Sequence, residues 1–374
     1  MRALFATQMS ERDRKAVALW LLGMGVLVAA MVLVGGATRL TDSGLSITEW
    51  RPVTGIVPPL SEAGWREEFA KYAAIPEYRL EKKGMSLDGF KAIYWWEWGH
   101  RFLGRLVGIA FFVPFAAFLV RRRLTRALAG RLLAVFLLGG LQGAVGWYMV
   151  MSGLSVRTDV SQYRLVMHLA LAVALFAAIL WLALSLWPRR EATQRRPAPR
   201  PVGRALLAFA GLVYAQMLAG GFVAGLDAGL AYNTFPLMDG RFVPEGLFAL
   251  EPWWRNLFEN RIAVQFDHRL LAYLVAGSAC ALWALRLRGL SGPLARRIDL
   301  VLAAVVLQIA LGIATLLAVV PIGLALAHQA GALLLLAAAL AAAHEALAGA
   351  SGRVPAAIPA PSVTAVTAAK DPAR

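Results

Sequence analysis

The sequence predicts an all-α membrane protein with eight transmembrane helices, arranged as two fused, parallel-repeat four-helix bundles with both termini in the cytoplasm. Two observations carry this prediction. Of the 374 residues, 59% are hydrophobic and only 16% are charged, which leaves too little polar surface for a soluble domain of this size. Motifs of the first half also recur in the second half, in the same order. A soluble enzyme is therefore excluded.

Eight apolar stretches are long enough to cross a bilayer, which requires about 20 helical residues. The first stretch exceeds the apolar region of a signal peptide and is not followed by an A-x-A cleavage site, so we expect a retained helix. No Arg- and Ser-rich presequence precedes it, which favours a bacterial over an organellar protein. The predicted spans are residues 16–36, 98–119, 132–151, 165–187, 205–224, 264–285, 299–319 and 323–345.

The distribution of basic residues predicts the orientation. The 38 lysines and arginines exceed the 22 acidic residues, and they cluster at the ends of the chain and in alternate loops. This is the pattern of cytoplasmic loops, so nucleic-acid binding is not expected. The external segments are then residues 37–93, which we expect to fold as a cap, and residues 225–262.

The same reasoning divides the chain into domains. Two halves with four spans each are joined by a basic cytoplasmic linker, and the Ala- and Pro-rich end is expected to be disordered. The predicted domains are a cytoplasmic N-terminus (1–15), an N-terminal half (16–187), a linker (188–204), a C-terminal half (205–345) and a cytoplasmic tail (346–374).

Internal repeats relate the two halves. The segment Glu97–Leu103 reads EWGHRFL, and the segment Gln265–Leu271 reads QFDHRLL. Because each half has an even number of spans, the halves share one orientation and are parallel repeats. We interpret two paired glutamines as bridges between helices, with contact to a cofactor as the alternative. The other matched positions are Gln142 with Gln308, His168 with His328, Gly35 with Gly220, and Asp42 with Asp227.

Four of the five histidines occupy matched positions, His100 and His168 in one half and His268 and His328 in the other. All four lie near the external ends of their spans. Two imidazoles facing each other across a four-helix bundle can hold a haem iron, and the single cysteine excludes a cysteine-based metal site. Hydrogen bonding to a neighbouring helix is the alternative, but duplication at one depth favours two haem sites. His344 is expected to be a surface residue.

Glu97 distinguishes the two halves. It lies one helical turn before His100, whereas its counterpart Gln265 cannot ionise, so the carboxylate marks the first half as reactive. It can relay protons or stabilise positive charge on a substrate, and the alternative is an interfacial carboxylate facing water. Arginines near this face can pair with haem propionates or simply extend to water. These candidates are Arg39, Arg101, Arg105 and Arg269.

These motifs together resemble the haem A synthase family, and the resemblance extends from about residue 16 to residue 345. It implies an enzyme of eight spans that oxidises the position-8 methyl of haem O to a formyl group, giving haem A for terminal oxidases. Residues 37–93 lack the cysteine pair of some bacterial members, so the chain is similar to the proteobacterial and mitochondrial branch. The resemblance rests on Glu97–Arg101, His268–Arg269, His168, His328 and Gly35–Ser46.

The resemblance also implies roles for the paired residues. His100 and His168 flank the iron of the substrate haem O, with Glu97 beside it as the catalytic residue. His268 and His328 hold the iron of a haem b that passes electrons. The implied location is the bacterial inner membrane, with both haem sites near the periplasmic face, and a membrane haem farnesyltransferase (haem O synthase) is the implied upstream partner.

Two other functions fit parts of the pattern. A quinone-linked di-haem b electron carrier would need the histidines but predicts symmetric halves, and a parallel-repeat transporter would use them as a proton relay. The sequence leaves open the electron-transfer partner, the source of the formyl oxygen and whether a histidine leaves the substrate iron. It also leaves open whether the protein is a homo-oligomer.

Overall fold

The structure is a computed structural model that describes residues 8–52, 54–155, 157–187 and 200–350. Within these residues it is all-helical, and eight helices are long and apolar enough to cross a membrane. The prediction of an all-α, multi-pass membrane protein is therefore confirmed. The eight long helices are α1 (Glu11–Leu40), α4 (Leu87–Val120), α5 (Arg126–Met151), α6 (Gln162–Leu186), α7 (Arg200–Gly225), α9 (Arg261–Leu287), α10 (Gly292–Leu317) and α11 (Ile322–Ala350).

Most of these helices extend beyond the apolar stretches that predicted them. The largest difference is at α4, which begins at Leu87 rather than residue 98 because Ser86 caps it, its side chain accepting a hydrogen bond from Gly89 N. Helix α11 continues to Ala350, so the first residues of the predicted tail are helical. The rest of that tail (351–374) and most of the predicted linker (188–199) lie outside the described residues.

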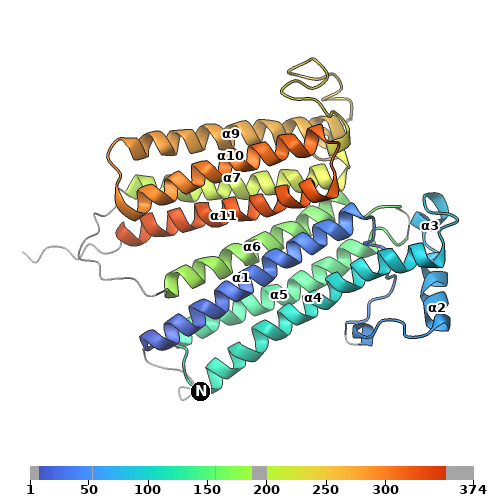
Figure 1. Cartoon of the computed structure of the whole chain (residues 1–374), viewed down its shortest axis with the longest axis horizontal. Helices are drawn as coiled ribbons and strands as arrows, with labels where there is room; N and C mark the ends of the chain where they lie inside the picture. The colour runs from blue at the N-terminus through green and yellow to red at the C-terminus, as the bar shows by residue number, and fades with distance from the viewer. Residues whose placement is uncertain (1–7, 53, 156, 188–199, 351–374) are drawn as a thin grey trace, which may run out of the picture.

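The long helices form two groups of four (Figure 1). In the first group, α1 and α5 each pack against both α4 and α6, so α4 and α6 lie diagonally opposite each other. In the second group, α7 and α10 each pack against both α9 and α11, which are likewise diagonal. The groups meet where α6 packs on α7 and α11, and where α1 packs on α11.

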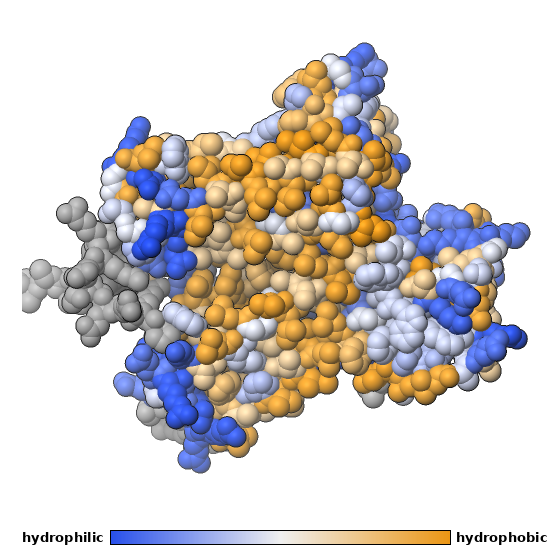
Figure 2. All heavy atoms as spheres, in the orientation of Figure 1, coloured by the Kyte–Doolittle hydropathy of each residue, from blue (hydrophilic) through white to orange (hydrophobic). Residues whose placement is uncertain are grey.

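The outer faces of the helices are apolar. Val26, Leu137 and Leu334 are 70%, 62% and 65% exposed, respectively. Figure 2 shows hydrophobic side chains across the middle of the visible face and hydrophilic residues towards its two ends. A continuous apolar surface of this kind suits contact with lipid rather than water.

The prediction that His344 lies on the surface is wrong. Its side chain is only 8% exposed, because α11 packs against α6 at this level. The imidazole lies edge-on to Trp181 at a centroid distance of 4.9 Å, and its Nε2 is 3.0 Å from Ser185 Oγ. His344 therefore belongs to the interface between the two groups of helices.

The segment between α1 and α4 folds over one end of the first group. It contains a 3-10 turn, η2 (Thr54–Ile56), and two short helices, α2 (Glu62–Tyr72) and α3 (Pro76–Leu80). Tyr72 and Phe90 are completely buried, with ring centroids 5.3 Å apart, so the first turns of α4 form part of its core. We refer to residues 41–86 as the cap.

The corresponding segment of the second group, between α7 and α9, is shorter and less regular. It contains the turns η4 (Ala228–Leu230) and η5 (Trp253–Arg255) and the short helix α8 (Asn256–Glu259). Asn256 is fully buried and holds the segment together by bonding the backbone of Leu250 in both directions, at 3.0 and 2.8 Å.

The cap contains a buried carboxylate that makes its stability depend on pH. Glu77 is 4% exposed and pairs with Lys82 at 3.2 Å. Burial outweighs this ion pair and raises the pKa of Glu77 from 4.5 to about 7. Between these pH values the folded cap binds a proton that the unfolded segment has released, so the free energy of unfolding falls as the pH rises through the window.

We predict that the cap of the unmodified protein loses up to about 3 kcal/mol of stability between pH 5 and pH 8. The Glu77→Gln variant should lose much less, because its side chain does not ionise. The measurement is the pH dependence of amide hydrogen exchange in α2 and α3. Glu62→Gln, at a side chain that is 70% exposed, should keep the original slope, and equal slopes in all three proteins would contradict the assignment.

Candidate functional site

In the first group of helices, each paired histidine packs against a glycine of a neighbouring helix. A Cβ atom placed on Gly35 of α1 would lie 3.1 Å from His100 Nε2, and one on Gly146 of α5 would lie 2.8 Å from His168 Cε1. These contacts are too close for any larger residue without movement of the rings.

The second group of helices repeats this arrangement. A Cβ atom on Gly220 of α7 would lie 3.2 Å from His268 Cε1, and one on Gly312 of α10 would lie 2.8 Å from His328 Cε1. Since α9 and α11 are diagonal, as α4 and α6 are, each pair of histidines extends from opposite sides of its group.

Glutamine side chains bridge to three of the four histidines. Gln142 Nε2 donates to the carbonyl oxygen of His168 at 3.0 Å, and Gln308 Nε2 donates to that of His328 at 2.9 Å. The same nitrogen atoms lie 3.3 and 3.5 Å from the Nε2 atoms of the respective rings. These contacts support the interpretation of the two glutamines as bridges between helices.

The third glutamine, Gln216 of α7, was missed from the sequence. Its Nε2 donates to the carbonyl oxygen of His268 at 3.0 Å and lies 3.2 Å from the ring Nδ1. Its counterpart in the first half is Met31, so no similarity between the two halves marks this position. Gln216 precedes Gly220 by four residues, just as Met31 precedes Gly35. This equal spacing is the signal by which the sequence could have identified Gln216.

Glu97 is almost completely buried, at 2% exposed, and all of its contacts are with donors. Its Oε2 accepts hydrogen bonds from Ser46 Oγ at 2.8 Å and from Ile47 N at 2.7 Å. Its Oε1 accepts from Arg101 Nε at 3.1 Å and Nη2 at 2.6 Å. Glu97 is therefore not an interfacial carboxylate that faces water.

The arginines that follow on α4 hold the cap by its backbone. Arg101 donates to the carbonyl oxygens of Ile47 at 2.8 Å and Glu49 at 3.0 Å. Arg105 donates to those of Pro52 at 2.9 Å and Arg51 at 2.9 Å. Charged donors of this kind make strong hydrogen bonds. The cap is consequently attached to α4, the helix that carries His100.

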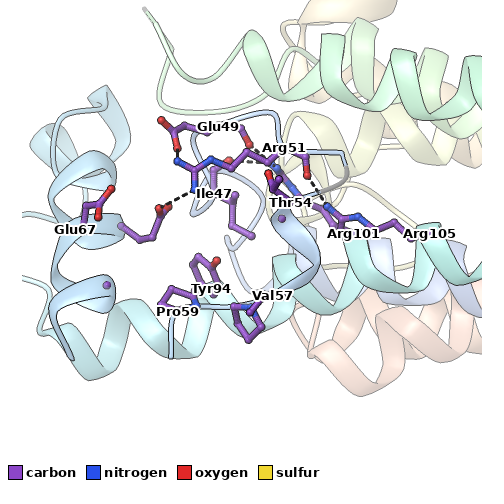
Figure 3. Close-up of a pocket in the computed structure, with 14 residues that line it drawn as sticks. Ile47, Glu49, Arg51, Thr54, Val57, Pro59, Glu67, Tyr94, Arg101 and Arg105 are labelled. Carbon is purple, nitrogen blue, oxygen red and sulfur yellow. Dashed lines mark hydrogen bonds and ion pairs between the residues drawn. The ribbon is translucent and has the colours of Figure 1, made fainter. Parts of the chain in front are cut away.

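A cavity of about 220 Å³ lies between the cap and α4. Figure 3 shows Glu67 of α2 and Arg105 of α4 on opposite sides of the view, with Tyr94 between them. Arg51 forms ion pairs with Glu49 and, at 3.8 Å, with Glu68 at this rim. The lining is therefore mixed in charge and belongs to the contact between cap and helix.

The second group uses the opposite hydrogen-bonding pattern at the equivalent place. Gln265 is 3% exposed, and its Nε2 donates to the carbonyl oxygen of Tyr232 at 3.1 Å. Arg269 donates to the same carbonyl at 3.2 Å and to that of Pro236 at 3.5 Å. The loop thus offers an acceptor to residue 265, whereas the cap offers donors to residue 97, so each loop matches the side chain it meets.

Arg39 links the two groups of helices at the end that carries the cap. It bonds Asp42 at 3.0 Å and both carboxylate oxygens of Asp227 at 3.0 Å. The structure thus brings Arg39, Arg101 and Arg105 to one end of the first group, and Arg269 to the same end of the second. Three of these arginines keep a buried nitrogen without a hydrogen-bond partner within the described residues, namely Arg39 Nε, Arg105 Nη1 and Arg269 Nε.

The fold and the site define a multi-pass helical membrane protein with two pairs of half-buried histidines. A family model described as cytochrome oxidase assembly protein (COX15-CtaA) matches residues 18–340. The chain belongs to this family, which confirms the resemblance seen in its motifs.

Similar curated proteins carry the name haem A synthase. That of Azorhizobium caulinodans is 54% identical over 341 residues, which cover 90% of this chain and 96% of the relative. That of Parvibaculum lavamentivorans is 52% identical over 328 residues, covering 88% and 93%, respectively. That of Nitrosospira multiformis is 52% identical over 334 residues, covering 89% and 94%.

We predict that exchanging the residues at positions 97 and 265 disrupts both loops. Glu97→Gln places an amide nitrogen among donors, and amide hydrogen exchange at Ile47 should become about tenfold faster. Gln265→Glu sets a carboxylate against the Tyr232 carbonyl and should destabilise the second loop by about 1–3 kcal/mol. If amide hydrogen exchange in both variants is as slow as in the unmodified protein, neither side chain holds its loop. The Glu62→Gln variant serves as the control.

Proposed function

We propose that this protein converts haem O to haem A by oxidising the position-8 methyl of the porphyrin ring to a formyl group. The observation that carries the proposal is the pair of histidines in each group of helices, accompanied in one group only by a buried carboxylate, Glu97. The names of the relatives support it. The two pairs make a reactive site and an electron-transfer site in one chain.

The chain consists of two parallel-repeat four-helix bundles, in which α1, α4, α5 and α6 correspond to α7, α9, α10 and α11. Equivalent helix neighbours support this, as do the four contacts between glycine and histidine. The turns after α1 and α7 also agree, with Asp42 and Asp227 in the left-handed region at φ 46° and 49°. Both termini are cytoplasmic by the positive-inside rule, and the cap is external.

His268 and His328 fit a haem b iron. Gly220 and Gly312 leave space against the two rings that a Cβ would fill, and the buried Nδ1 of His328 has no hydrogen-bond partner within the described residues. Neutral imidazoles in an apolar bundle are the donors that a b-type haem takes. When bound, this group supplies reversible one-electron transfer, and the chain's residues keep it in place and away from water.

His100 and His168 flank the iron of the substrate haem O. Glu97 lies one turn from His100, and its four donors hold it as a fixed carboxylate, so we assign it to the stabilisation of positive charge that develops at the oxidised carbon. A proton relay is the weaker assignment, because both oxygen atoms are already bound by donors.

The arginines divide into two roles. Every nitrogen of Arg101 is used by Glu97 and the cap, so Arg101 positions the carboxylate. Among the described residues, Arg39, Arg105 and Arg269 each retain a buried donor without a partner, which is available to a haem propionate. Of these, Arg39 and Arg105 belong to the substrate half and Arg269 to the haem b half.

The substrate and its environment set the place of the reaction. Haem O is a membrane-soluble, farnesylated haem, which a membrane farnesyltransferase supplies. Conversion of the methyl to the formyl group removes four electrons and adds one oxygen atom, so an oxidant must take up these electrons. The location is the bacterial inner membrane, with both sites near the periplasmic face, since the histidines lie at the external ends of their helices.

We predict that Glu97→Gln, in protein purified from a host that makes haem O, retains both haems but forms the formyl product about 100-fold more slowly. His268→Ala combined with His328→Ala should lose haem b while haem O remains. Extraction followed by reverse-phase chromatography with mass detection measures both effects. Normal formyl production in Glu97→Gln would remove its catalytic role, and an unchanged haem b content in the double variant would favour other ligands. Glu62→Gln is the matched carboxylate control.

A further inference from the structure

One histidine differs from the other three in how its helix neighbours hold it. His168, His268 and His328 each receive a glutamine amide on the backbone carbonyl, with the same nitrogen 3.2–3.5 Å from the ring. Within the described residues, His100 has no such glutamine. The exception lies in the half that carries Glu97 and the cap.

The difference comes from a single pair of repeat-related positions. Gln216 of α7 contacts His268, and Met31 occupies the equivalent position of α1, four residues before the glycine that packs on the histidine. Met31 does face the helix of His100. A Cβ atom on Gly104, one turn after His100, would lie 3.4 Å from Met31 Cε. Met31 therefore fills the equivalent space without offering a hydrogen bond.

A ligand that is fixed by a second residue exchanges less readily than one that is held only by packing. The glutamine amides donate to the backbone carbonyls of His168, His268 and His328, so they tie each of these residues to a neighbouring helix and limit its movement. The ring of His100 packs on Gly35, which adds no polar contact. His168 is held by Gln142 from α5 in addition to its contact with Gly146.

We propose that His100 is the ligand that leaves the substrate iron most readily. We attribute this to Met31, which occupies the position that Gln216 holds in the other half. Gln216 keeps His268 in place as a permanent ligand on the electron-transfer side. This inference rests on the proposed function, because it assigns a difference in ligand lability to the two haem sites. Met31 and Gln216 are positioning residues, since each acts through a histidine.

Carbon monoxide binding to the reduced protein tests this directly, because CO binds ferrous haem only where an axial ligand leaves. The proteins are purified from a host that makes haem O, and their haems are quantified by extraction. Soret difference spectra are then recorded during CO titration under anaerobic reduction. The His268→Ala, His328→Ala double variant identifies the spectrum of the substrate site.

The unmodified protein should bind CO at the substrate haem and leave haem b six-coordinate. Met31→Gln should weaken CO binding at the substrate haem about tenfold, the effect of one added hydrogen bond on the competing histidine. Gln216→Met should make haem b reactive towards CO. Met31→Leu, which adds no donor, should behave as the unmodified protein.

Unchanged CO affinity and stoichiometry in Met31→Gln and Gln216→Met, with both haems present, would overturn the inference and leave the proposed function intact. If Met31→Gln loses its haem, the test rests on Gln216→Met and Gln216→Leu. A haem b that does not bind CO in either of these variants contradicts the inference. The absence of both haems from the unmodified protein would instead overturn the proposed function, and this inference with it.

Discussion

Inside a bilayer a polar side chain must find its hydrogen-bond partners within the protein, and most of this structure follows from how the paired histidines meet that requirement. Each imidazole lies in a space made by a glycine on the adjoining helix, and three are bridged by glutamine amides to a neighbouring helix. The glycines set how close the helices come, and the glutamines bind helix to helix. The same glycines and glutamines therefore determine both the geometry of the site and the packing of the bundle.

The same requirement explains the cap. A carboxylate as deeply buried as Glu97 is costly unless donors surround it. Ser46, Ile47 and Arg101 provide those donors, and because two of them belong to the cap, the charge fixes the cap to α4. In the other half Gln265 meets a carbonyl oxygen, so an amide suffices. The difference between the two halves thus has a structural basis in addition to the catalytic one that we propose.

Much of the architecture could be predicted from the sequence, because apolar length and charge distribution are strong signals in membrane proteins. Helix ends were less predictable. The first turns of α4 are amphipathic and pack into the cap, so hydropathy did not reveal them. Pairwise repeats identified the four histidines, but the same approach overlooked Gln216, whose counterpart Met31 has different chemistry. The burial of His344 was not predicted, because it depends on how α6 and α11 pack where the two groups of helices meet. The sequence of one helix alone does not reveal that packing.

The most direct test of the account is the haem composition of the unmodified protein, purified from a host that makes haem O and analysed by chromatography with mass detection. Two haems per chain are expected: one haem b, and one farnesylated haem that carries a methyl, hydroxymethyl or formyl group at position 8. Haem b alone, in both sites, would contradict the assignment of His100 and His168 to the substrate and would point to an electron carrier.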